Sequence, residues 1–272
     1  MKLSLFSAVL ALLLGLSVQH NPLVRPHDEV VKTKEPFRLD ITSKILETNK
    51  GSNQILVEGD VVLSKKRNAM KCWSSYCKWE KSYNGLVEVP YTLSDYFYDS
   101  EKALIVKAME SFQKKTCIRF VPYHGQSDYL SIESHLGCWS TIGKDGGQQV
   151  VSLSVYGCLD HGVIQHELLH ALGFHHEHTR SDRDQYVRIN WENIPDANVF
   201  DFHKMDTNNL NTPYDYSSIM HYGRTYFSST FGADTITPIP DSSVPIGQRV
   251  DMSDIDILRI NRLYECSEYR NS

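Results

Sequence analysis

The sequence lacks an excess of basic residues, internal repeats and low-complexity tracts. Its 28 Lys and Arg residues stand against 33 Asp and Glu residues, which gives a formal net charge of −5. This mild acidity argues against a nucleic-acid partner and against a polybasic membrane-binding surface. The chain of 272 residues has the length and composition of an ordinary globular protein with one or two domains.

Sequons for N-linked glycosylation are also missing. The nearest match, Asn211-Thr212-Pro213, has proline where serine or threonine is needed. We therefore expect no N-linked glycan.

Long apolar runs are absent beyond the first residues, which read MKLSLFSAVLALLLGLSVQH. Lys2, a short apolar core and the small residues Gly15 and Ser17 form the pattern of a secretory signal peptide, which we place at residues 1–17. A membrane helix is the alternative, but the run is too short to span a bilayer. We expect a secreted, extracellular protein that could be stored in secretory granules, with no membrane partner.

Cysteine is missing from the region before residue 72, where an extracellular protein could use it. The chain then has an even number, six: Cys72, Cys77, Cys117, Cys138, Cys158 and Cys266. None of their spacings matches a zinc ribbon or finger, so three disulfides are the expected use in an oxidising compartment. The residues alone leave the pairing open.

Residues 18–67 have no cysteine, few aromatic residues and many charges. The stretch ends in Lys65, Lys66 and Arg67, which would suit a trypsin-like or furin-like protease. Most basic triplets are solvated turns, but the change in composition at this point favours processing. We predict a propeptide at residues 18–67, removed by an activating protease between Arg67 and Asn68.

The remaining sequence predicts an α+β domain at residues 68–266, followed by a short tail at 267–272. Apolar patterns predict strands over 86–93, 117–123, 129–134 and 148–155. The second half contains many Asn, Pro, Asp and Ser residues and favours irregular structure. Strands and a helix first, then loops and a helix, predict two lobes with a cleft between them.

Helical spacing predicts helices over 100–116, 161–173 and 252–266. Ser100 is the expected N-cap of the first helix, and Gly173 is the expected end of the second. Ile164, Leu168, Ala171 and Leu172 would form one apolar face of the second helix. The last helix is marked by Ile255, Leu258 and Leu263.

The stretch HELLHALGFHHEH, residues 166–178, predicts a metal site. Residues four apart on a helix share a face, so His166 and His170 can bind one Zn²⁺. Glu167 is placed to take a proton from a water activated by the metal. Gly173 lets the chain turn so that His176 becomes the third ligand. Three protein ligands leave one position open, as in a catalytic zinc site.

A core helix with incidental histidines is the alternative interpretation. The full pattern H-E-x-x-H-x-x-G-x-x-H is much more specific than its first five residues and favours the metal site. We expect His175 not to be a ligand, because it cannot share the direction of its neighbour, and His178 to serve as a hydrogen-bonding residue. His161 is expected to be structural. The predicted reaction is peptide-bond hydrolysis without a covalent intermediate.

The strings HELLHALGFHHEHTRSDRDQYVRINWENI (166–194) and YDYSSIMHYG (214–223) resemble the astacin family of zinc endopeptidases, a branch of the metzincins. Within that family the sequence is most similar to six-cysteine hatching enzymes of fish, through NAMKCW, TCIRFVP, DTNNLNTPYDYSSIMHYGR and DTITPIPDSSVPIGQR. The likeness covers residues 68–266. It implies one zinc ion per chain and a two-lobed metzincin fold, with a twisted, mostly parallel sheet and the active-site helix in the N-terminal lobe.

The resemblance also implies roles for single residues. Met220 would form the Met-turn beneath the zinc, and Tyr222 would be a weak fifth ligand that moves away to stabilise the oxyanion. Glu177 would pair with the mature N-terminus through water. The family disulfides imply the pairs Cys117–Cys266 and Cys138–Cys158, which leaves Cys72–Cys77 as a small local loop.

The segment VEGD, residues 57–60, resembles the family's latency motif, although Val57 and Glu58 replace its usual aromatic residue. In that motif Asp60 would occupy the water's position on the zinc and block catalysis until the propeptide is removed. By residue type alone, an Asp after a Gly would be a turn residue.

The predicted function is a secreted zinc endopeptidase made as a zymogen. The hatching-like resemblance implies protein substrates in the egg envelope, namely chorion or zona-pellucida-type glycoproteins. One alternative is a related enzyme that cleaves another extracellular protein, such as a matrix or prey protein. A second alternative is an inactive homologue that only binds protein, which the presence of Glu167 and Tyr222 argues against.

Overall fold

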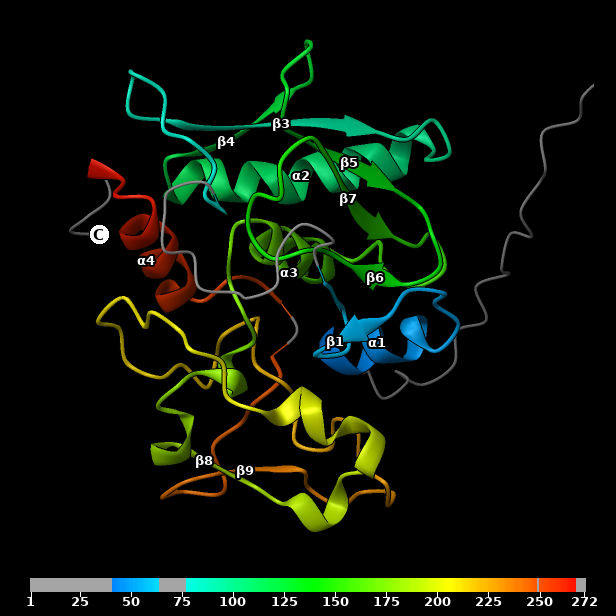
Figure 1. The fold of residues 1–272 in the computed structure, drawn as a ribbon, viewed down its shortest axis with the longest axis vertical. Coiled ribbons are helices and arrows are strands. Elements are labelled where there is room, and N and C mark those ends of the chain that lie inside the picture. The colour runs from blue at the N-terminus through cyan, green and yellow to red at the C-terminus, as the bar shows by residue number, and fades with distance from the viewer. Residues whose placement is uncertain (1–40, 64–76, 249, 268–272) are drawn as a thin grey trace, which may run out of the picture. The chain divides into compact units, whose positions relative to one another are not determined.

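The computed structural model describes residues 41–63, 77–248 and 250–267 (Figure 1), which all lie within one compact unit, Leu39–Ser272. The expected signal peptide, the expected cleavage site at Arg67-Asn68 and Cys72 fall outside the described residues. Within those ranges, no helix combines the length and the apolar character needed to cross a bilayer.

A five-stranded sheet forms the frame of the N-terminal half (Figure 1). Its strands lie side by side in the order β4 (Ile118–Pro122), β3 (Val87–Leu93), β5 (Tyr129–Glu133), β7 (Gln148–Leu153) and β6 (Cys138–Trp139). The first four strands are parallel, and β6 is antiparallel to β7. The mostly parallel sheet and the α+β class are confirmed. Strand β6 was not predicted, because two residues show no periodicity.

Helix α2 (Asp99–Lys115) packs against strand β4 and against the helix that carries the histidines. Its buried face includes Ile105, Met109 and Phe112. Ser100 was predicted to be the N-cap of this helix, but the helix begins at Asp99 and its N-cap is Tyr98. The amide of Tyr98 instead donates to the carboxylate of Glu101 at 2.8 Å and caps the first turn.

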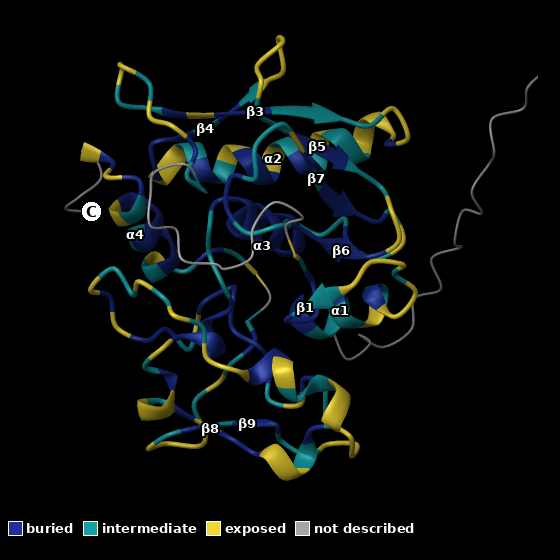
Figure 2. Ribbon diagram, viewed as in Figure 1, coloured by how far each residue is buried: buried dark blue, intermediate teal, exposed yellow. Residues whose placement is uncertain are grey.

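Helix α3 (His161–Ala171) is buried from Gly162 to its end (Figure 2). The carboxylate of Asp160 accepts a hydrogen bond from the Gly162 amide at 3.2 Å and caps its N-terminus. Gly173 has φ +106°, which a side-chain-bearing residue rarely adopts, and turns the chain away. The predicted single apolar face was too narrow, because polar and apolar residues of α3 are buried on every side.

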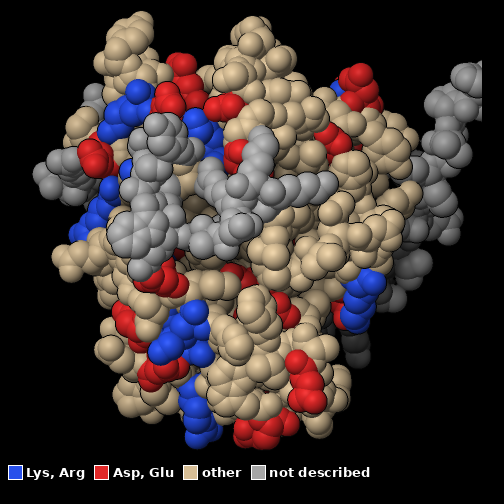
Figure 3. Space-filling model, viewed as in Figure 1, with Lys and Arg blue, Asp and Glu red and all other residues tan. Residues whose placement is uncertain are grey.

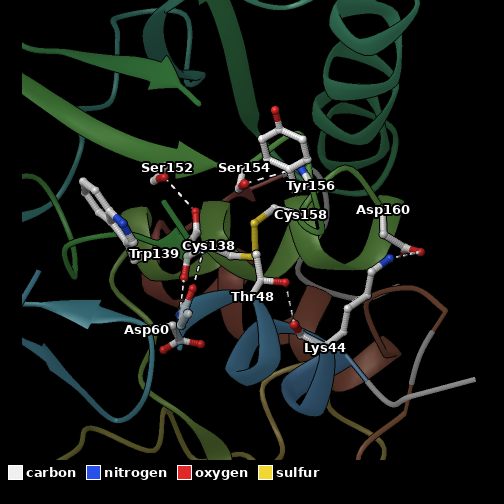
Figure 4. The surroundings of a disulfide bond; sticks show 12 residues. Lys44, Thr48, Asp60, Cys138, Trp139, Ser152, Ser154, Tyr156, Cys158 and Asp160 are labelled. Atoms are coloured by element: carbon white, nitrogen blue, oxygen red, sulfur yellow. Dashed lines mark hydrogen bonds and ion pairs between the residues drawn. A yellow bond between two sulfur atoms is a disulfide. The ribbon is translucent and has the colours of Figure 1, made fainter. Parts of the chain in front are cut away.

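Residues 41–63, for which the sequence predicted no element, form a helix and a hairpin. They are α1 (Ile41–Asn49), β1 (Leu56–Val57) and β2 (Val61–Val62), and the two strands are antiparallel. Helix α1 contacts α3 and β6 and inserts Ile41 and Ile45 into the main core. Figure 4 shows the Cys138–Cys158 disulfide beside α1 and the Lys44–Asp160 ion pair, whose N–O distance is 3.3 Å.

The same segment covers the outer edge of β6 and the residue that follows it. The side-chain amide of Asn49 donates to the Cys138 carbonyl at 2.7 Å and accepts from the Cys138 amide at 2.6 Å. The Val62 amide donates to the Ser140 carbonyl at 2.9 Å, and the Ser140 amide donates to the Asp60 carbonyl at 3.1 Å. These hydrogen bonds satisfy backbone donors and acceptors that an edge strand would otherwise leave unpaired.

The C-terminal half is irregular, as predicted. It contains the strand pair β8 (Val187–Ile189) and β9 (Ile236–Pro238), and four 3₁₀ helices, η2 (Glu177–Thr179), η3 (Arg183–Gln185), η4 (Trp191–Asn193) and η5 (Asp196–Phe202). A second apolar cluster, which includes Phe202, Tyr222 and Ile236, lies here.

Helix α4 (Asp254–Leu263) ends the described structure (Figure 1). The helix lies within the predicted range, and the residues that marked it, Ile255, Leu258 and Leu263, are only half-buried. The buried positions instead include Asp256, Ile257, Arg259 and Ile260, so two charged side chains face inward.

Two disulfides tie these elements together. Cys117–Cys266 joins the start of β4 to the residues after α4, and Cys138–Cys158 joins β6 to the loop before α3. The first closes a loop with a sequence separation of 149 residues, which in the chain-entropy account is worth roughly 4–5 kcal/mol. The pair Cys72–Cys77 stays a prediction, because Cys72 lies outside the described residues.

Candidate metal centre

Four buried side chains converge below the sheet, namely His166, His170, His176 and Asp60. One nitrogen or oxygen atom of each lies within 4.8 Å of the others, and all four residues have no exposed surface. His166 and His170 come from α3, His176 from the turn after Gly173, and Asp60 from the hairpin of residues 56–62. The structure thus brings together the three histidines of the motif and the Asp that was singled out in VEGD.

Hydrogen bonds to each Nδ1 fix how the imidazoles face the centre. The Nδ1 of His166 lies 2.9 Å from the Ile219 carbonyl, and that of His170 lies 2.7 Å from the Phe174 carbonyl. The Nδ1 of His176 lies 2.9 Å from a carboxylate oxygen of Glu58. Because carbonyls and carboxylates only accept, these Nδ1 atoms carry the hydrogens. The Nε2 atoms of the three rings therefore face one another and are the atoms left to bind a metal.

The spacing of the ligand atoms fits a tetrahedral zinc ion. Bonds of 2.0–2.1 Å in a tetrahedron put neighbouring ligand atoms roughly 3.3 Å apart. The His166 and His176 Nε2 atoms are 3.2 Å apart. The Asp60 oxygens lie 3.0, 3.3 and 3.4 Å from the Nε2 atoms of the three histidines. Converging lone pairs and a carboxylate repel one another unless a cation lies between them, so the donor set fits Zn²⁺.

Without a metal, the positive charge between the rings and Asp60 would have to come from protonated histidines. Burial disfavours the charged form of both His170 and His176, and it lowers the pKa of His170 to about 4. For His176 the burial is outweighed by Asp60 and Glu58, which raise its pKa to about 9. The pKa values of His170 and His176 thus differ, because only His176 has a carboxylate next to each of its two ring nitrogens.

The backbone around Gly59 places Asp60 at the centre. Glu58 and Gly59 both have positive φ, +51° and +80°, and form the turn between the two strands of the hairpin. A Cβ on Gly59 would lie 2.6 Å from the Tyr226 hydroxyl oxygen. Glycine is therefore needed both for the left-handed backbone and for the close approach. The turn directs the next residue, Asp60, toward the histidines.

Glu58 binds the histidine segment from the same turn. Its carboxylate contacts the Nδ1 atoms of His175 and His176 at 3.0 and 2.9 Å. Its amide donates to the Asp201 carboxylate at 2.7 Å, and its carbonyl accepts from the Tyr222 hydroxyl. Burial opposes ionisation of Glu58, but the two histidines hold its pKa well below the ordinary value.

Glu167 is fully buried, and neither carboxylate oxygen has a hydrogen-bond partner in the part of the chain that the structure describes. Burial, and to a lesser degree the negative charge of Asp60, raises its pKa well above the ordinary value of a carboxyl group. A buried carboxyl group with a raised pKa, next to a metal ligand in sequence, is suited to accept and return a proton.

Tyr222 and Met220 lie on the loop opposite α3. The Tyr222 ring centroid is 4.6 Å from that of His176, and the ring is fully buried. The Met220 side chain belongs to the main core, and its carbonyl accepts a hydrogen bond from the Glu177 amide at 2.9 Å. Both residues predicted from the Met-turn string thus border the segment that carries the third histidine.

The other histidines lie outside the four-residue cluster. His178 stacks on Tyr222 with ring centroids 3.7 Å apart, and its Nε2 donates to the Asp201 carbonyl at 3.0 Å. His161 is partly exposed, and its Nε2 is 3.8 Å from the Asp251 carboxylate. His175 contacts Glu58 instead of the centre.

Glu177 is held inside the protein by two arginines. Its carboxylate pairs with Arg259 at 2.5 Å and with Arg180 at 3.5 Å. The predicted partner, a mature N-terminus, lies outside the described residues.

Sequence reasoning missed the roles of Glu58, Asn49, Asp201 and Arg259. Glu58 could have been found from its place two residues before Asp60. Arg259 could have been found from the helical spacing, because it lies one turn after Asp256 and next to the apolar Ile260. The other two carry no local signal.

The family model for the astacin peptidases matches residues 75–265. The chain therefore belongs to the astacin family, and it is a zinc metalloendopeptidase with the predicted α+β fold.

Within the astacin family, the chain is similar to hatching enzymes of fish. The chain is 58% identical over 228 residues to "High choriolytic enzyme 1" of Oryzias latipes, a match that covers 84% of each chain. It is 56% identical over 229 residues to "Low choriolytic enzyme" of the same fish, again with 84% of each chain covered. Among solved structures, the hatching-enzyme zinc protease HCE-1 of medaka has 60% identity and a TM-score of 0.71, with 73% of this chain and all of that chain covered.

Removing zinc should lower the melting temperature of the full chain. A site held at about 1,000 times its Kd gains about 4 kcal/mol from its ligand, which for a protein of this size corresponds to roughly 10 °C. The His166→Ala variant should lose this zinc-dependent shift, whereas His161→Ala, on the same helix, should keep it. Calorimetry with and without chelator checks both, and equal shifts in the two variants would contradict the site.

Proposed function

We propose that this chain is a secreted, zymogen-activated zinc endopeptidase that digests proteins of the egg envelope. The observation that carries the zinc chemistry is the convergence of three Nε2 atoms beside a buried Glu167. The egg-envelope role is supported by the names of the medaka relatives, which are choriolytic enzymes.

In this proposal His166, His170 and His176 bind the zinc ion. A bound zinc supplies a Lewis acid that polarises the substrate carbonyl and lowers the pKa of water. Glu167 accepts the proton of the attacking water and passes it to the leaving nitrogen as the peptide bond breaks. The Tyr222 hydroxyl, released from the Glu58 carbonyl, would donate a hydrogen bond to the carbonyl oxygen, which becomes an oxyanion when water adds to the carbonyl carbon.

Latency in this proposal comes from the segment of residues 18–67. Asp60 takes the fourth position at the metal, which the attacking water needs. Helix α1, the hairpin and the contacts of Glu58 hold it there. Cleavage between Arg67 and Asn68 would free the segment, which carries no disulfide that could retain it, since its range contains no cysteine.

The face shown in Figure 3 has no large patch of one charge among the described residues. On the face shown in Figure 3, basic and acidic side chains of the described residues are interspersed. The second candidate function keeps the same chemistry with another extracellular protein as substrate.

Replacing Glu167 with Gln should abolish nearly all hydrolysis while zinc stays bound. General base catalysis contributes roughly 10²–10⁴-fold, and glutamine cannot accept the proton. Cleavage of casein by the processed protein measures the loss, and elemental analysis measures the zinc. The exposed Glu192→Gln change is the control and should keep full activity. Unchanged casein cleavage by the Glu167 variant would refute the assigned base.

Replacing Asp60 with Ala should make the uncleaved chain active, because the position for water at the metal is no longer filled. The test compares peptide hydrolysis by uncleaved wild type, Asp60→Ala and Glu47→Gln, which changes an exposed residue of α1. Only the Asp60 variant should be active before processing. Full latency in that variant would count against the capping role.

Isolated egg envelope and gelatin separate the two candidate functions. The processed protein should release soluble peptides from the envelope much faster than from gelatin at equal substrate mass. Mass spectrometry of the released peptides identifies the cleaved proteins, with the Glu167→Gln variant as a blank. Rapid digestion of gelatin and an intact envelope would favour the alternative substrate.

A further inference from the structure

The inner face of α4 carries two charged side chains that reach toward the loops around the histidine cluster. Asp256 and Arg259 are one helical turn apart, and they are only 3% and 7% exposed. Burying a charge is costly unless it is paired. The partners of these two residues therefore show which parts of the molecule α4 holds in place.

Arg259 forms a two-pronged ion pair with Glu177. Its Nη1 and Nη2 donate to the two carboxylate oxygens at 2.5 and 2.8 Å. Further hydrogen bonds from the guanidinium reach the Thr212 hydroxyl and the Pro213 carbonyl, both at 2.9 Å. Paired forks of this kind fix orientation as well as distance.

The ion pair with Arg259 also restrains His176, because Glu177 directly follows His176 in the chain. Its amide donates to the Met220 carbonyl at 2.9 Å, and one carboxylate oxygen accepts from the Asp215 amide at 2.7 Å. Backbone and side chain of Glu177 thus tie the third histidine to the loop that contains Met220. Through its ion pair with Glu177, Arg259 connects the third histidine and the Met220 loop to helix α4.

Asp256 makes the matching contact on the other side. Its carboxylate accepts from the Ser218 hydroxyl at 2.6 Å and from the Ile219 amide at 3.0 Å. The Ile219 carbonyl in turn accepts from the Nδ1 of His166. Helix α4 therefore reaches two of the three histidines, each through one intervening residue.

We propose that Arg259 is a positioning residue of the zinc site. By holding Glu177 it fixes the backbone of His176, so that the third imidazole completes the ligand set at the right distance. This inference rests on the proposed ligand assignment. The pair also compensates the charge of Glu177 without a new N-terminus, so the third ligand is in place before processing.

The test uses the full chain with Arg259→Lys, Arg259→Met and, as control, Arg262→Met. Arg262 lies on the same helix but is exposed and donates to the carbonyls of Leu210 and Asn211. Lysine keeps the charge but lacks the planar fork. Both Arg259 variants should raise the Kd for zinc at least about tenfold, the scale seen when a residue that orients a ligand is lost. The control should change it less than about twofold.

Zinc affinity is measured by competition with a chromophoric chelator, and ligand geometry by the absorption spectrum of the Co²⁺-loaded chain. Both Arg259 variants should shift the Co²⁺ spectrum. After processing, they should lower kcat with little change in KM. A purely structural role would lower the melting temperature of the metal-free chain and leave the zinc Kd and the Co²⁺ spectrum unchanged, which would overturn the proposal.

Without Arg259 the buried Glu177 carboxylate keeps only the longer contact to Arg180 at 3.5 Å, and the single variants could fail to fold. The double variant Glu177→Met/Arg259→Met removes both charges, and such replacements usually keep the fold. It should still bind zinc more weakly than wild type, and wild-type zinc affinity would overturn the proposal. Failure of the wild-type chain to bind zinc would instead overturn the ligand assignment itself.

Discussion

Everything in the site depends on three imidazole lone pairs being held toward one point inside a dry interior. Three neutral rings beside a carboxylate in this arrangement would repel one another, so a positive charge, from a metal ion or from a protonated His176, has to balance them. The protein keeps the arrangement through acceptors on each Nδ1, and these acceptors come from three different parts of the chain. Helix α3 supplies the fixed spacing of two rings, and the turn at Gly173 delivers the third.

The segment of residues 41–63 contacts the histidine cluster directly. It supplies the carboxylate that faces the three rings and the Glu58 acceptor for one of them. It also occupies the Tyr222 hydroxyl. One short hairpin thus contacts the three histidines, the Nδ1 of His176 and the hydroxyl of Tyr222 together. The proposed release of the segment would break all three sets of contacts at once, so the proposed activation would be nearly all-or-none.

Much of the fold and the core of the site could be predicted from sequence, because their signals are local. The histidine spacing follows from helical geometry, and four of the strands follow from apolar patterns. Boundaries failed where a side chain decided them: Glu101 caps α2 with Tyr98 as the N-cap, two residues before the predicted Ser100. The charged residues on the buried face of α4 were not recognised, because their partners, such as Glu177, are far away in sequence. Helix α1 escaped notice because its apolar residues find their partners only in the folded protein.

Under the proposed activation, the cover over β6 would have a further consequence. Asn49, Asp60 and Val62 satisfy amides and carbonyls that would otherwise lie open at the border of the sheet. Open borders of this kind invite pairing with other chains. While the cover stays attached, concentrated protein is shielded from such self-association. If the proposed cleavage removes the cover, the bare strand would be open to an extended polypeptide, so protection from self-association and access for a substrate would depend on one and the same stretch of backbone.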